Sequence, residues 1–194
     1  MMKQQPHIGR QVSHFHQVIV DGIEAVFSED MKYRYRLSIP FADEPSRTKT
    51  LTVILKNPSS ADAMRADKTV QNVEKVVYKS FTDVGRIEVL NLFALRGTYP
   101  KDIMEAYVAG INIIGKENNS AFAQALMNSH YIVIAWGGAS PIRSSLYDAR
   151  VDDVMNMIDR GKFKNKIFRK KEKGSDKYPF HACYWPDNTD FSVC

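Results

Sequence analysis

The chain of 194 residues, with 44% hydrophobic and 25% charged side chains, is long enough for one well-packed domain and short for two. Its 27 Lys and Arg residues against 22 Asp and Glu residues give a formal net charge of +5, which favours a polyanionic partner without identifying one. Two cysteines outside any metal-ligand spacing, and the lack of an apolar run of about 18 residues, argue against a disulfide framework and a membrane-spanning helix. We therefore expect one cytoplasmic, monomeric domain over residues 1–194, with no metal and no cofactor.

The amino-terminal part predicts a tail followed by a pair of strands. Residues 1–16 are expected to form the tail. Residues 17–40 alternate apolar and polar side chains around Asp21 and Gly22, a pattern typical of antiparallel strands joined by a turn. The polar segment 41–49 then predicts a loop that leads into the main body of the chain.

Residues 50–186 alternate apolar runs with helical segments, which predicts an α/β core. The segments between the runs are long enough for right-handed crossovers, so the runs predict buried parallel strands. The expected strands are 51–55, 87–93, 131–137 and a last one at 178–185. The expected helices are 69–80, capped by Asp67 or Thr69, then 117–128, and 141–161 with Pro141 at its first position. The predicted fold is a three-layer α/β/α sandwich around a mostly parallel sheet of about four strands, with the antiparallel strands added to it.

Polar or aromatic residues follow each predicted parallel strand. They are Asn57-Pro58-Ser59-Ser60-Ala61-Asp62, Asn91 with Arg96, Trp136-Gly137-Gly138, and His181 near Tyr184 and Trp185. Taken singly, each has an ordinary explanation as a turn, a core aromatic or a satisfied histidine. Because the carboxyl ends of parallel strands meet at one edge of a sheet, their succession predicts one shared cleft.

These motifs resemble those of the uracil-DNA glycosylase superfamily, in the same order along the chain. That superfamily has a strand followed by Gly-x-Asn/Asp-Pro, a strand ending in Leu-Asn, a strand reading apolar-Trp-Gly, and a late motif that begins with His. This chain has ILKNPSS, VLNLFALR, IVIAWGG and His181. The first motif is most similar to that of the mismatch-specific uracil/thymine glycosylases, with Lys56 in place of the leading Gly, Ser59 in place of the Gly after Pro, and Ala182 in place of the Pro after His. Residues 33–186 also resemble an uncharacterised bacterial and phage family with Asn-Pro-Ser-x-Ala-Asp, Asn-Leu-Phe-Ala-x-Arg and Ala-Trp-Gly motifs.

The glycosylase resemblance implies a role for each predicted site residue. Asn57 would position a water at the anomeric carbon, with Asp62 or Asp67 supplying a carboxylate, since an amide cannot act as a general base. His181 would stabilise the departing base. Asn91 would read the Watson–Crick edge of a base flipped out of the stack. Pro58, Ser59, Ser60 and Trp136 complete the expected base pocket.

Residue Ser59 bears on the choice of base. By the same resemblance, the strict uracil enzymes have a Tyr at the position of Ser59, and its ring blocks substituents at C5 of the pyrimidine. A serine leaves room for thymine or for a larger C5-modified pyrimidine, such as the hydroxymethyl or glycosylated cytosine of phage DNA. Ser60, Arg96 and Tyr99 are candidates to bond such a substituent, so a role in defence is expected alongside repair.

A basic run at 160–173 contains eight Lys or Arg residues and one acidic residue, Glu172. It predicts either a solvated loop or a contact with DNA phosphates, and its Lys170, Lys171 and Lys173 join Arg96 as expected DNA-binding residues. Two other functions stay open. A small-molecule nucleotide or nucleoside hydrolase would use the same strand-end site without a basic flank, and a non-catalytic nucleic-acid-binding module would keep the basic run without needing Asn57.

Overall fold

The computed structural model describes residues 10–42, 44–160, 166–171, 175 and 177–194. Seven strands form one sheet in the order β2-β3-β6-β4-β7-β8-β9. Their bounds are β2 Glu24–Phe27, β3 Arg34–Pro40, β4 Lys49–Leu55, β6 Val84–Asn91, β7 Tyr131–Ile134, β8 Lys166–Lys170 and β9 Phe191–Val193. Two short strands, β1 Gln11–Val12 and β5 Ala66–Asp67, pair separately and antiparallel. The helices are α1 Lys68–Ser80, α2 Pro100–Val108, α3 Asn118–Met127 and α4 Ser144–Arg160, with 3-10 turns η1 at Val20–Gly22 and η2 at Ala182–Tyr184.

The centre of the sheet is parallel and its edges are antiparallel. Strands β6, β4, β7 and β8 run parallel to their neighbours in that order. On one side β3 and β2 continue the sheet antiparallel, and on the other β9 does. The prediction of an α/β protein with a parallel centre and added amino-terminal antiparallel strands is therefore confirmed, and β9 extends the sheet by one strand that was not expected.

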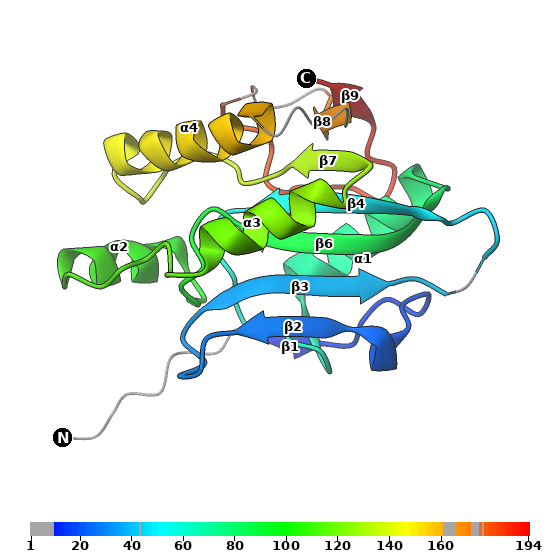
Figure 1. Cartoon of the computed structure of the whole chain (residues 1–194), viewed down its shortest axis with the longest axis horizontal. Helices are drawn as coiled ribbons and strands as arrows, with labels where there is room; N and C mark the ends of the chain where they lie inside the picture. Colours follow the sequence, from blue (N-terminus) through cyan, green and yellow to red (C-terminus); the bar gives the residue numbers. More distant parts are fainter. Residues whose placement is uncertain (1–9, 43, 161–165, 172–174, 176) are drawn as a thin grey trace.

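Two hydrophobic cores, one on each face, make the arrangement three-layered. Helix α1 lies behind the sheet in Figure 1 and packs its valines against one face, whereas α3 and α4 cover the other. Successive residues of β4 serve opposite cores: Val53 and Leu55 face α1, and Ile54 faces α3 and α4. All three are buried, which explains why a continuous apolar run marks this strand. A fully buried aliphatic side chain contributes ~1.5–3 kcal/mol, so these runs hold the layers together.

Four details of the sequence prediction are wrong. Asp21 and Gly22 belong to η1, and the turn between β2 and β3 spans residues 28–33. Residues 10–16 are packed rather than a free tail, since β1 pairs with β5 and His14 forms a buried contact with Glu74. The fourth parallel strand is β8, within the basic run, and the apolar 178–185 segment instead contains η2. Pro141 precedes α4 and follows Ser140 through a cis peptide bond.

The helices at 68–80 and 118–127 match their predicted ranges closely. Asp67 is the cap of α1, where its carboxylate accepts a hydrogen bond of 2.9 Å from the Val70 N–H. Helix α2 was not predicted, although Pro100 at its first position and Asp102 at its third are ordinary start signals.

One edge of the sheet collects the segments that build the site. The loops after β4, β6 and β7 all leave at the carboxyl ends of parallel strands, on the left in Figure 1. Strand β3 runs antiparallel to β6, so its first residue, Arg34, lies at the same edge and donates its backbone N–H to the Ala94 carbonyl. Within the described part of the chain, no helix is both long enough and apolar enough to cross a membrane.

Candidate functional site: a pocket at the carboxyl edge of the sheet

A pocket of about 600 Å³ opens at this edge. The loop after β4, the start of α1, the loops after β6 and β7, and the segment around η2 form its wall. Its volume falls within the range of about 300–1,000 Å³ that is usual for small-ligand sites. Of the residues that the sequence analysis offers for the site, Asn57, Ser59, Asp67, Tyr99 and His181 line it, so the structure brings them together from distant parts of the chain.

Asn57 has a fixed amide with a free acceptor. Its Nδ2 donates a hydrogen bond of 2.8 Å to the Gly97 carbonyl, and the Gly97 N–H donates one of 2.9 Å to the Pro58 carbonyl. Only the amino group of an amide can donate to a carbonyl, so this contact sets which way the side chain faces. None of the described residues donates to Oδ1 of Asn57, which leaves an acceptor on the pocket wall.

His181 presents the complementary group, a donor. Its Nδ1 accepts a hydrogen bond of 3.2 Å from the Cys183 N–H, so the neutral ring carries its proton on Nε2. Burial, together with the positive charge of Lys56, lowers the pKa of His181 from 6.5 to about 4. The ring is therefore neutral at pH 7, and no residue that the structure describes accepts a hydrogen bond from the Nε2 proton.

The backbone of Gly137 makes room for this ring. Gly137 has a φ of +75°, and a Cβ at this position would lie 2.9 Å from the Cβ of His181. Both the left-handed conformation and the close approach require glycine. The Gly after Trp in the third motif thus sets where the histidine of the fourth motif sits.

Lys56 lies in the pocket wall although the sequence suggested no role for it. Its Nζ donates to the carbonyls of Gly138, at 2.6 Å, and Ser140, at 3.3 Å. The side chain therefore ties the loop after β4 to the loop after β7. Burial lowers the pKa of Lys56, and no carboxylate among the described residues forms an ion pair with it.

Arg34 and the start of α1 form the other side of the pocket. Arg34 is only 1% exposed, and its Nη1 donates a hydrogen bond of 2.9 Å to the Ala61 carbonyl. Burial lowers its pKa to about 10, against the opposing effect of the Asp67 charge. Asp67 and Thr69, at the cap and first turn of α1, also line the pocket. Two exposed aromatic side chains, Tyr99 and Tyr184, complete its rim.

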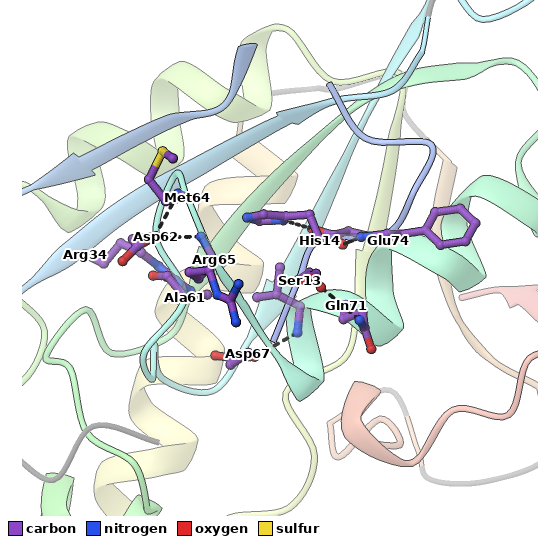
Figure 2. A network of polar contacts seen from close by, with 12 residues as sticks. Ser13, His14, Arg34, Ala61, Asp62, Met64, Arg65, Asp67, Gln71 and Glu74 are labelled. Carbon is purple, nitrogen blue, oxygen red and sulfur yellow. Dashed lines mark hydrogen bonds and ion pairs between the residues drawn. The ribbon is translucent and has the colours of Figure 1, made fainter. Parts of the chain in front are cut away.

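Asp62 lies in the loop between β4 and α1 and does not line the pocket. Its Oδ1 accepts hydrogen bonds of 2.9 Å from the N–H groups of Met64 and Arg65, and Gln11 donates to its Oδ2 at 3.2 Å. Figure 2 shows this carboxylate directed at its own loop, with Asp67 at the start of the helix. Of the two carboxylates expected from the sequence, the structure therefore places Asp67, and not Asp62, at the pocket.

The other predicted base-binding residues lie in the interior of the protein. Pro58, Ser60, Asn91 and Trp136 are all buried and do not line it. Asn91 ends β6 opposite Leu55, and neither polar atom of its amide has a hydrogen-bond partner among the described residues. Trp136 donates its indole N–H to the Lys177 carbonyl at 2.9 Å. These four side chains therefore do not face the pocket.

The predicted DNA-binding residues are also spread out. Arg96 holds the loop after β4 from outside, donating to the Ser59 carbonyl at 3.4 Å and lying 5.0 Å from the Phe27 ring centroid. Lys170 is the last residue of β8 and is buried, with its Nζ 5.2 Å from the centroid of Phe180. Lys171 is exposed, and Lys173 lies outside the described residues. Residues 166–170 of the basic run are thus a strand of the sheet, which corrects the expectation of a solvated loop for this part of the run, and the contact with DNA phosphates stays a prediction.

The structure defines an α/β protein with a polar pocket at the carboxyl edge of its parallel strands. A family model described as "Protein of unknown function (DUF1643)" matches residues 34–181, and the chain belongs to that family. The match begins at Arg34 and ends at His181, so it includes every residue that lines the pocket except Cys183 and Tyr184. Neither the curated proteins nor the solved structures include a match to the chain.

Proposed function

We propose that this protein is a DNA glycosylase that hydrolyses the N-glycosidic bond of a flipped pyrimidine nucleotide. One observation carries the proposal: the free acceptor of Asn57 and the free Nε2–H donor of His181 line a single nucleotide-sized pocket. Cleavage of this bond moves its electron pair onto the base and leaves an oxocarbenium-like sugar, so it needs a donor at the base and an acceptor that holds a water. The order of the strand-end motifs supports the same assignment.

In this mechanism Asn57 Oδ1 accepts a hydrogen bond from the attacking water. The water adds to the anomeric carbon after the bond to the base has lengthened, so its proton need not be removed beforehand. Asp67 is the carboxylate in the pocket and takes that proton as the new C–O bond forms. Its own hydrogen bond to the Val70 N–H fixes the carboxylate at the start of α1.

His181 donates a hydrogen bond from its Nε2–H to an oxygen of the departing base. A neutral imidazole with a lowered pKa is a hydrogen-bond donor that does not protonate the base, so the base leaves as a stabilised anion. The charge on Lys56 adds to this effect, since Lys56 lines the same pocket. Ser59, also in the wall, leaves space for a substituent at C5, which makes modified or mismatched pyrimidines the proposed substrates, with phage-defence or repair roles to match.

A small-molecule nucleotide hydrolase is the second candidate, and the buried cations favour it. Arg34 and Lys56 both line the pocket, and a charged phosphate on a free nucleotide would pair with them. A non-catalytic nucleic-acid-binding module would have no need of an unpaired acceptor and an unpaired donor in one pocket. It is therefore the least favoured of the three.

The test is incubation with duplex and single-stranded oligonucleotides that carry uracil, mismatched thymine, hydroxymethylcytosine or its glucosylated form, followed by alkali to reveal abasic sites. Asn57→Ala should slow release of every accepted base about 10²- to 10³-fold, as for other preorganised polar groups. Asn128→Ala is the matched control, because Asn128 is exposed and precedes β7 at the opposite edge of the sheet. Release of free bases from mononucleotides, but from none of the oligonucleotides, would replace the proposal by the second candidate.

A further inference from the structure

Arg34 is a buried cation without an anionic partner. Its side chain is enclosed, yet only one hydrogen bond, to the Ala61 carbonyl, satisfies its five N–H donors within the described residues. Its Nε is fully buried and has no partner, and no carboxylate that the structure describes lies within 4 Å of the guanidinium nitrogens. A buried arginine with unpaired donors lowers the stability of the fold unless a ligand supplies the missing hydrogen bonds and charge.

The start of α1 lines the same pocket and attracts the same kind of ligand. Helix α1 has 13 residues, and the N–H groups of its first turn have no acceptor within the helix. Asp67 takes the Val70 N–H, and the Thr69 side chain lines the pocket beside it. Backbone N–H groups and the helix dipole together favour an anion at such a place.

The charges of the pocket indicate which anion fits. Arg34 and Lys56 are cations, Asp67 is a carboxylate, His181 is neutral, and burial raises the pKa of the Cys183 thiol, so one positive charge is left over. A phosphodiester carries one negative charge and balances it, whereas a phosphomonoester carries about two at pH 7 and leaves an excess. The planar fork of an arginine also matches two oxygens of one phosphate.

We propose that Arg34, with the first turn of α1, binds a phosphodiester group of the nucleotide whose base enters the pocket. The inference rests on the proposed function for the identity of that nucleotide. The phosphate would lie between the guanidinium and the Thr69 side chain and would accept hydrogen bonds from the Nη groups of Arg34. Arg34 is thereby a positioning residue, which holds the sugar–phosphate backbone while Asn57 and His181 act on the glycosidic bond.

The experiment uses a trinucleotide with a central tetrahydrofuran abasic analogue, so that no base preference enters. One version has charged phosphodiesters on both sides of the analogue, and the other has neutral methylphosphonates. The full-length protein should bind the charged version about 10- to 100-fold more tightly, as charge-assisted hydrogen bonds would give. Arg34→Met should remove this preference, and Arg65→Met, an exposed arginine outside the pocket, should keep it. Equal binding of the two versions by the unaltered protein would overturn the inference.

Two further measurements cover the other outcomes. If Arg34→Met does not fold, the ¹⁵N resonance of the Arg34 Nε in the unaltered protein should shift with the charged trinucleotide and not with the neutral one, and the lack of a shift would refute the site. If deoxyribose 5-phosphate binds more tightly than the charged trinucleotide and loses affinity in Arg34→Met, the diester assignment is wrong and the anion is a free monoester. Base release is scored separately, so an Arg34-dependent preference without any base release would keep the phosphate site and remove the glycosylase proposal.

Discussion

The protonation of His181 should make stability fall in mild acid by an amount that the structure allows us to work out. In the unfolded chain the ring titrates near 6.5, and in the folded protein its pKa is about 4. Because the folded value is the lower one, the unfolded state binds more protons between these values. The contribution of His181 to the free energy of unfolding is therefore complete above pH 6.5 and is lost as the pH falls towards 4.

The size of the loss follows from proton linkage. Between pH 7.5 and pH 5 the difference between the two pKa values corresponds to about 2 kcal/mol of unfolding free energy. His181→Gln removes the titrating ring and keeps an amide of similar reach. The unaltered protein should thus lose about 2 kcal/mol more than the variant over this interval.

The assay is urea unfolding of both proteins at pH 5, 6 and 7.5, with His16→Gln as the control for loss of an exposed imidazole. Because only the pH dependences are compared, any loss of unfolding free energy that His181→Gln causes at pH 7.5 cancels. Parallel pH dependence of the unaltered protein and His181→Gln would refute the reasoning, because it would mean that the ring is neither enclosed nor close to Lys56.

The remaining predictions concern three other positions. Gly137→Ala should lower the unfolding free energy by about 1–3 kcal/mol, because it combines a positive φ with a contact at 2.9 Å, whereas Gly138→Ala, with open space around it, should change it little in the same urea titration. Ser59→Tyr should abolish release of C5-substituted pyrimidines and spare folding, and equal release of substituted and unsubstituted bases would show that Ser59 does not border C5. Lys171→Glu should change the free energy of unfolding by no more than about 0.5 kcal/mol and should reduce the slope of DNA-binding affinity against salt concentration by about one. An unchanged slope would remove Lys171 from the DNA interface. Lys170→Glu should lower the free energy of unfolding in urea, because Lys170 is buried against Phe180.

The parallel strands could be predicted because their sequence reports burial on both faces. In β4, Val53 and Ile54 serve different cores and are both fully buried, so an unbroken apolar run is the expected pattern. Strand β8 gave no such signal. It lies between β7 and β9 near the edge of the sheet, and its basic side chains interrupt the apolar pattern by which a strand is recognised. By contrast, the apolar stretch around Phe180 packs as a loop, which composition alone does not distinguish from a strand.

The sequence could predict the edge of the sheet where the candidate site lies, but not which strand-end side chains line the pocket. Position at the end of a strand correctly indicated the edge where Asn57 and Ser59 meet His181. It could not show that Asn91, at the end of the neighbouring strand, is fully buried and does not line the pocket. Whether a strand-end side chain reaches a pocket depends on which face of the sheet it occupies and on what the next loop covers, and neither is visible in a motif.

Arg34 is the clearest case of a site residue that no local pattern indicates. It lies at the beginning of a strand, whereas the rule for ligand sites in parallel sheets concerns the carboxyl ends of strands. Because β3 is antiparallel to β6, however, the amino end of β3 is found at the carboxyl edge of the sheet. An antiparallel strand added to a parallel sheet therefore contributes its first residues, rather than its last, to the ligand edge. Once β3 was known to be antiparallel and adjacent to β6, a charged residue at its start, followed by the buried Leu37 and Ile39, would have pointed to this edge.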